Sequence, residues 1–240
     1  MTIEVYLYCW NEMQILPLVI KHYQKFCDKI ILMDHYSDDG SKEYALKQGC
    51  EVRSFGIPGE HDDDKLRDSK NNIWKGSQAD WVIVCDCDEV LYITSPDLFV
   101  AWLNLYTKDS ICTIFKTQGW DIYSNEMPKE DLLEITTGWP FNNYSKNIIF
   151  SPYHIKEINY DHGAHVCRPT GNVIWSEETL YVLHYKNIGG VQRLLKRNRK
   201  IAKRMSRNNR RKGYGCHYML WPQEVINEWN DKIKICKSLI

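Results

Sequence analysis

The sequence lacks any uninterrupted apolar run that approaches the roughly 18 residues needed to span a membrane, which excludes a transmembrane class. Its N-terminal stretch contains Glu4 and neither a basic start nor a small-residue cleavage site, so it predicts no secretory signal and we expect a cytoplasmic protein. The nine cysteines show no paired spacing, which favours reduced thiols over a disulfide framework. With 43% hydrophobic and 26% charged residues, the composition is that of a globular protein and excludes disordered and collagen-like classes.

Two glycine motifs that bind phosphates are also absent. No G-x-G-x-x-G follows the first apolar run, and G-x-x-x-x-G-K-[ST] occurs nowhere in the chain. Dinucleotide-binding and P-loop sites need these glycines because backbone N–H groups must approach the phosphates closely. The sequence therefore excludes both kinds of site, and a ligand bound here does not depend on a glycine cradle.

Acidic residues are missing from the segment 193–212, which carries 11 Lys and Arg residues. The whole chain has 31 basic and 31 acidic residues, so outside this segment 20 basic residues stand against 31 acidic ones and the rest of the chain is acidic. Leu194, Ile201 and Met205 recur near helical spacing, which predicts a helix with one packed face. The other side of this helix, which carries the basic residues, is then a solvated surface, a site that binds a diphosphate, or a docking site for an anionic membrane or nucleic acid.

Apolar runs of strand length alternate with segments of helical period in the first half of the chain. The expected strands cover 3–9, 29–33, 51–55 and 81–85, and the expected helices follow Asn11 and cover 42–49 and 66–78. This alternation predicts βαβ units, and hence a mainly parallel, Rossmann-like sheet flanked by helices. We expect a single domain over 1–240, with this α/β half at 1–109 and a smaller mixed half at 110–240 that begins with a strand over 110–115.

Polar clusters follow three of the expected strands, at the sheet edge where α/β proteins bind ligands. They are 10–12, 34–41 and Asp86-Cys87-Asp88-Glu89. The two aspartates lie one residue apart after an apolar strand, so both carboxylates can reach one hard cation, Mg²⁺ or Mn²⁺, that leaves positions open for substrate phosphates. Alternatively, these acidic residues only cap the turn that follows.

Several motifs follow one another in a fixed order, namely Trp10-Asn11-Glu12, Leu16-Pro17, His22-Tyr23, Asp34 with 37–41, and 80–89. This ordered series resembles the family 2 glycosyltransferases of GT-A fold, which carry a D-x-D motif. The resemblance is close over 3–92 and looser through 146–150, 163–165 and 183–185. It implies transfer of a sugar from a nucleoside-diphosphate sugar, with a UDP-sugar favoured, to a hydroxyl of a glycan, lipid-linked sugar or protein. It also implies inversion of configuration and a Mn²⁺ or Mg²⁺ cofactor.

The resemblance places the donor in the half at 1–109 and the acceptor in the half at 110–240. Asp34 would contact the nucleoside base, while Asp86 and Asp88 would hold the metal and the ribose-diphosphate. His184 ends a late apolar run and is the candidate third metal ligand, with His165 second. The implied donor-binding residues are Tyr8, Trp10, Glu12, Asp34, Arg67, Lys70, Asp86, Cys87 and Asp88. Arg67 and Lys70 could equally lie on a solvated helix face, and His35 stands where the family has a second acidic residue.

An inverting reaction needs a carboxylate base that deprotonates the acceptor hydroxyl. Asp161 and Asp121 are the candidates, since each follows an apparent strand, although either could be a turn aspartate. The competing hypothesis is a non-enzymatic module that binds RNA or an anionic membrane through 193–212, and a third is a nucleotidyltransferase. We expect no nucleic-acid partner and leave a peripheral membrane contact through 193–212 open.

Overall fold

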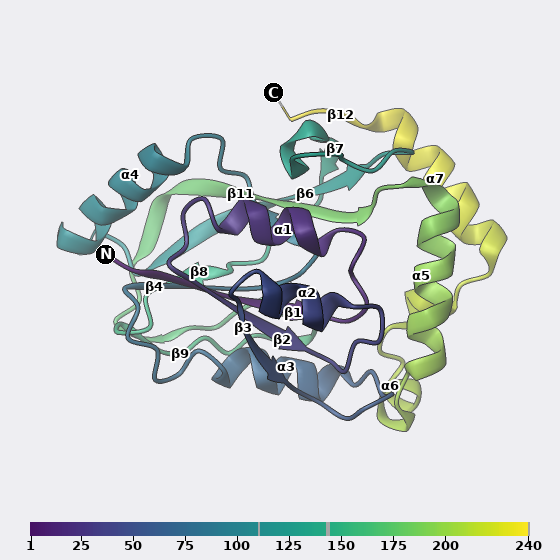
Figure 1. The fold of residues 1–240 in the computed structure, drawn as a ribbon, viewed down its shortest axis with the longest axis horizontal. Helices are drawn as coiled ribbons and strands as arrows, with labels where there is room; N and C mark the ends of the chain where they lie inside the picture. Colours follow the sequence, from purple (N-terminus) through teal and green to yellow (C-terminus); the bar gives the residue numbers. More distant parts are fainter. Residues whose placement is uncertain (110, 143–144, 240) are drawn as a thin grey trace.

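The computed structural model describes residues 1–109, 111–142 and 145–239 of the chain (Figure 1). The strands are β1 (Ile3–Cys9), β2 (Lys29–Asp34), β3 (Glu51–Ser54), β4 (Trp81–Asp86), β5 (Glu89–Leu91), β6 (Ile114–Tyr123), β7 (Thr137–Pro140), β8 (Ile149–Phe150), β9 (Ile155–Glu157), β10 (Thr170–Gly171), β11 (Trp175–Asn187) and β12 (Lys237–Ser238). The α-helices are α1 (Leu16–Tyr23), α2 (Ser41–Lys47), α3 (Asp63–Asn72), α4 (Pro96–Asp109), α5 (Gly190–Arg204), α6 (Arg207–Lys212) and α7 (Pro222–Ile235). The short 3₁₀ turns include η1 (Leu132–Glu134), η3 (His162–Ala164) and η4 (Cys216–Met219).

Ten strands form one sheet that runs through both halves of the chain. Its main path is β12-β7-β6-β8-β4-β1-β2-β3, and β11 pairs with β5 and β6. The neighbours β3, β2, β1 and β4 are parallel, whereas β7, β8 and β12 pair with their neighbours in the antiparallel sense. The predicted α/β class, with a mainly parallel first half and a mixed second half, is confirmed. The donor and acceptor roles of the two halves stay predictions.

Helices cover both faces of this sheet. Successive residues of β1 point to opposite faces, so each face carries apolar side chains that a helix must cover. Val5 and Leu7 pack with α1 in one apolar cluster, while Tyr6 and Tyr8 pack with Trp74 beyond α3 in another. Figure 1 shows α4 at one end of the sheet and α5, α6 and α7 gathered at the other. All nine cysteines are free, as the sequence predicted. In the described part of the chain, no helix is long and apolar enough to cross a membrane.

Three predicted boundaries differ from the structure for local reasons. Helix α3 starts at Asp63, earlier than the expected 66, because the Asp62 side chain accepts the Lys65 N–H at 3.2 Å and caps it. The basic segment forms two helices rather than one, since Ser206 caps α6 by accepting the Asn209 N–H at 3.0 Å. The strand expected from 110 begins at Ile114 and continues to Tyr123; residue 110 lies outside the described residues.

His22 makes the stability of the fold depend on pH. Its side chain is 2% exposed, Nε2 donates to the Leu91 carbonyl at 3.0 Å, and Nδ1 has no partner among the described residues. Burial lowers the pKa of His22 to about 4, so the folded chain keeps this imidazole neutral while the unfolded chain protonates it below about pH 6.5. The contribution is therefore complete above pH 6.5 and is lost as pH falls from 6.5 towards 4.

We expect His22 alone to lower the free energy of unfolding by about 2 kcal/mol between pH 7 and pH 5. Urea denaturation of the wild type and of His22→Leu at both pH values measures this effect. The variant is expected to lose that part of the pH dependence, whatever its stability at pH 7. An equal pH dependence in the two proteins would contradict the prediction.

Candidate functional site

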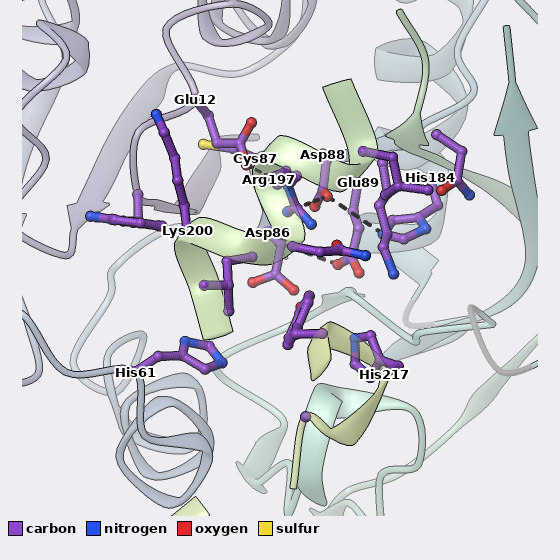
Figure 2. Close-up of a pocket in the computed structure, with 18 of the residues that line it drawn as sticks. Glu12, His61, Asp86, Cys87, Asp88, Glu89, His184, Arg197, Lys200 and His217 are labelled. Carbon is purple, nitrogen blue, oxygen red and sulfur yellow. Dashed lines mark hydrogen bonds and ion pairs between the residues drawn. The ribbon is translucent and has the colours of Figure 1, made fainter. Parts of the chain in front are cut away.

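A cavity of about 1050 Å³ opens where β1 and β4 end. Parallel register places Tyr8 beside Asp86 and Cys9 beside Asp34, so the polar residues after β1, β2 and β4 meet at one edge. Figure 2 shows Asp86, Asp88 and Glu89 together in this cavity with Arg197 of α5 beside them. The lining therefore combines the β4–β5 turn, the end of β11, and helices α5 and α7.

Asp86 is held by two buried lysines. Lys70 Nζ lies 2.6 Å from Asp86 Oδ1, and Lys146 Nζ lies 3.4 Å from Oδ2 and also pairs with Glu89. Lys70 is 2% exposed and Lys146 4%. Burial acts to raise the pKa of Asp86, but the charges of Lys70 and Lys146 outweigh it and hold the pKa well below its usual range. The first aspartate of the D-x-D motif is thus ionised and neutralised by the chain itself.

This buried network predicts a large loss of stability when one lysine is removed. Lys146→Met leaves Glu89 without its cation, and breaking a buried pair in this way costs about 3–5 kcal/mol. The control is Lys75→Met, which breaks an exposed 2.7 Å pair with Glu157 worth at most about 1 kcal/mol. Chemical denaturation of both variants measures the difference. Equal losses of unfolding free energy in the two variants would mean that the buried charge of Lys146 does not stabilise the fold through Glu89.

Asp88 faces a different set of cations. Arg197 Nη2 lies 2.9 Å from Asp88 Oδ2, and its Nε donates to Glu12 at 3.0 Å. Arg193 adds a contact of 3.7 Å to Glu12. Burial acts to raise the pKa of Asp88, but Arg197 and His184 outweigh it and lower the pKa. Helix α5 therefore connects the end of β1 to the D-x-D motif through one guanidinium.

His184 lies between Asp88 and Asp121. The parallel register of β11 and β6 sets His184 beside Asp121, and Nδ1 is 3.2 Å from Asp121 Oδ1. An ionised carboxylate only accepts hydrogen bonds, so Nδ1–H is the donor. Asn187 Nδ2 donates to both Asp121 oxygens, at 3.0 and 3.2 Å. Asp121 is 3% exposed, lines the cavity and accepts hydrogen bonds on both oxygens, and its position is that of a group that orients His184.

The residues around Asp88 fit a divalent cation in part. Asp88 Oδ2 and His184 Nε2 are 3.6 Å apart, which is longer than a hydrogen bond, and two ligands of one cation at about 2.1 Å can stand at this separation. Arg197 already binds this carboxylate as a cation. Among the described residues, no group of three or more His, Cys, Asp or Glu side chains is arranged to hold a metal. A cation held by these two side chains would have its remaining positions open to water and substrate.

Several other predicted donor residues also line the cavity. The Tyr8 hydroxyl bonds to Ser69 at 2.8 Å, and Lys70 Nζ lies 5.3 Å from the centre of its ring. The Trp10 indole is covered by the Arg204 guanidinium, 3.6 Å from the ring centre. Cys87 is 1% exposed, and its backbone N–H donates to the Tyr8 carbonyl at 2.9 Å, so this residue chiefly fixes the turn.

The structure places other predicted residues away from this cluster. Asp34 is 1% exposed, accepts the Ser37 N–H at 3.2 Å and does not belong to the described cavity lining. Arg67 pairs with Asp64 and Asp68 on α3, outside the same lining. Asp161 precedes η3 and lies 4.0 Å from Arg168, again outside it. His165 lines the cavity from an exposed position, where a Cβ on Gly163 would lie 2.4 Å from its Nε2.

The sequence interpretation missed several residues of the site. Arg193, Arg197 and Arg204 recur at i, i+4 and i+11, so helical spacing alone puts them on one face and could have indicated them. Lys146 opens the stretch 146–150 of the looser resemblance, but the sequence analysis assigned it no role in the site. Glu228 of α7 also lines the cavity. It is the only carboxylate in the described lining without a hydrogen bond or ion pair.

Comparisons with known proteins give partial matches to solved structures. No family model matches, and no curated protein matches. Glucosyl-3-phosphoglycerate synthase from Mycobacterium tuberculosis, in complex with Mn²⁺, UDP and glucosyl-3-phosphoglycerate, is 24% identical over 49% of this chain and 44% of its own, with a TM-score of 0.34. S. aureus TarS 1–349 is 10% identical over 84% of this chain and 64% of its own, with a TM-score of 0.48. The same TarS protein in complex with UDP-GlcNAc gives a TM-score of 0.47 at the same identity. The chain thus spans less than two thirds of both proteins.

Proposed function

We propose that the protein is a glycosyltransferase that moves a sugar from a nucleoside-diphosphate sugar to a hydroxyl acceptor. The observation that carries the proposal is the meeting of Asp86, Asp88 and His184 at the carboxyl edge of the sheet, inside one large cavity. The resemblance of the ordered motifs to family 2 glycosyltransferases with a D-x-D motif supports it. The cavity volume of about 1050 Å³ suits a ligand of this size.

For the donor, we propose that Asp88 and His184 hold a divalent cation, Mn²⁺ or Mg²⁺. When bound, such a cation neutralises charge on a diphosphate leaving group. Lys70 and Lys146 keep Asp86 ionised and fixed, so that its carboxylate is available to a ribose hydroxyl. UDP is the favoured nucleotide, with its base near Trp10 under the Arg204 guanidinium.

We propose that Asp121 positions His184 and is not the base. Its carboxylate lines the cavity but is 3% exposed and already accepts hydrogen bonds from His184 and Asn187, which favours orienting the histidine over taking a proton. Holding Nδ1–H leaves Nε2 facing Asp88, which is how a carboxylate fixes a histidine ligand. Asp161, the other candidate base, lies outside the described cavity lining.

We propose Glu228 as the base of an inverting reaction. Burial lowers the pKa of Lys186, whereas the negative charges of Asp121, Asp88 and Glu228 act to raise it. The Glu228 carboxylate is therefore close enough to attract the same ammonium group as Asp88. Glu228 is exposed on α7 and lines the cavity beside Trp139 and Lys232 of the half at 110–240. A carboxylate there can take the proton of an acceptor hydroxyl as the bond to the sugar forms.

Thermal unfolding with nucleotides tests the donor site. A ligand that binds only the native state stabilises it by RT ln(1 + [L]/Kd), which is about 2.7 kcal/mol at a hundred times Kd. UDP, GDP, dTDP and CDP are each added with Mn²⁺ or with excess chelator. We expect one diphosphate, UDP, to raise the midpoint, and chelation to remove the rise. No shift with any of the four would contradict the proposal.

The competing function is a non-enzymatic module that binds through 193–212. Three arginines of this segment, Arg193, Arg197 and Arg204, instead face the cavity and contact Glu12, Asp88 and Trp10. A binding module would keep its activity with chelator and lose it steeply with salt. A glycosyltransferase would lose its activity with chelator and depend only weakly on salt. Analysis of the products separates it from a nucleotidyltransferase, which transfers the nucleotide rather than the sugar. The cytoplasmic location stays a proposal.

A further inference from the structure

Three consecutive apolar residues stand exposed at the turn from η4 into α7. Met219 is 44% exposed, Leu220 42% and Trp221 77%, the largest value for a large hydrophobic side chain in the described part of the chain. The Trp221 backbone N–H donates to the Glu224 carboxylate at 2.7 Å, so the backbone is fixed while the indole stands in solvent. We refer to residues 219–221 as the apolar tip.

A group of exposed cations lies on the neighbouring helices α5 and α6. Within the described residues none of them forms an ion pair, unlike Lys212, which binds Asp64 at 2.6 Å. We call this set the basic face. It consists of Lys196, Arg199, Lys200, Lys203, Arg207 and Arg211. On α5 the basic face is opposed by the buried residues Leu194, Leu195 and Asn198, so the cations line the solvent side.

The apolar tip and the basic face belong to one surface. Arg210 Nη1 lies 3.9 Å from Met219 Sδ, and the same guanidinium donates to the backbone carbonyls of Ala202 and Met205. This side chain therefore joins the tip to the junction of α5 and α6. Figure 1 shows these helices and the start of α7 at the end of the molecule opposite α4.

We propose that this surface docks on the face of an anionic lipid bilayer. Trp side chains favour the membrane–water interface, and each Lys or Arg close to anionic headgroups adds to the attraction. A nucleic acid would offer phosphates to the basic face but no apolar layer to cover Met219 and Leu220. Lys196 and Lys200 also line the cavity, so docking brings the cavity mouth towards the lipid. The proposal is independent of the donor site.

Vesicle co-sedimentation tests the docking. The full chain is mixed with vesicles of phosphatidylcholine and phosphatidylglycerol, or of phosphatidylcholine alone, at about 0.15 M salt. We expect binding to the anionic vesicles only, weakened at least about tenfold by Trp221→Ser. Arg207→Gln with Arg211→Gln should weaken it by about 30-fold, from the attraction of two headgroup-facing cations. Tryptophan emission should shift to the blue on anionic vesicles in the wild type but not in Trp221→Ser.

Matched controls separate the surface from general effects. Leu98→Ser removes a 71% exposed apolar side chain from α4, at the other end of the molecule, and should leave vesicle binding unchanged. Lys116→Gln with Lys156→Gln removes the same charge from exposed positions elsewhere and should have a smaller effect than the arginine pair. No binding to anionic vesicles overturns the proposal. So does tight binding of a short RNA that Trp221→Ser leaves unchanged.

Discussion

Asp88→Asn is expected to reduce sugar transfer more than about 100-fold and to abolish the Mn²⁺-dependent stabilisation by UDP. The variant keeps the shape of the side chain and removes the charge that Arg197 and His184 share, 2.9 and 3.6 Å away. Changes to groups that only support a metal ligand cost about 10–100-fold, so loss of the ligand itself should exceed that range. Initial rates with a UDP-sugar and thermal unfolding with UDP measure the two effects.

The control for this prediction is Asp97→Asn, which changes an exposed aspartate at the start of α4, away from the cavity. It should leave both the rate and the UDP shift unchanged. The losses of rate and of UDP shift in Asp121→Asn should lie between those of Asp88→Asn and Asp97→Asn, because this variant disturbs His184 without removing a ligand. A full UDP shift with Mn²⁺ in Asp88→Asn would contradict the placement of the cation.

Glu228→Gln is expected to lower kcat by about 10²–10⁴-fold while the UDP shift and the donor KM stay unchanged. The Glu228 carboxylate makes no hydrogen bond or ion pair among the described residues, so the substitution removes a proton acceptor without breaking a contact of the fold. Steady-state rates at saturating acceptor and varied donor measure both kcat and the donor KM.

The matched control is Glu177→Gln, an exposed glutamate on β11 outside the described cavity lining. Its kcat and donor KM should equal those of the wild type. An unchanged kcat in Glu228→Gln would assign the proton to another group. A reduced UDP shift in the same variant would mean instead that Glu228 acts on the donor.

The sequence was most informative where local pattern and position in the fold coincide. Alternating apolar runs were enough to predict β1, β2 and β4 within a residue or two, because each is a buried parallel strand with turn residues after it. The fold class by itself predicts that 10–12 and 86–89 lie at one edge of the sheet. His184 was a candidate from the family resemblance and from its place late in an apolar run, and it lines the same cavity, while its role as a metal ligand stays a prediction.

Long-range pairings explain what the sequence could not indicate. Lys146 reaches Asp86 across 60 positions, and Arg197 reaches Glu12 across 185, so neither contact leaves a local pattern. Asp121 and Asp161 looked alike, since each follows an apparent strand. Only the register of β6 against β11 buries Asp121 beside His184. The D-x-D motif and Lys70 were identified in the sequence, but the contacts of Lys146 and Arg197 with these carboxylates were not.

Release of the nucleotide from a panel of nucleotide-sugars is the most direct test of the proposed reaction. The purified chain is incubated with UDP-, GDP-, dTDP- and CDP-sugars and Mn²⁺, with and without chelator, and the products are separated chromatographically. Glycosyl transfer predicts that one donor, a UDP-sugar, releases its nucleoside diphosphate and that chelator or Asp88→Asn stops the release. Release of a nucleoside monophosphate, or no release from any donor, would contradict it.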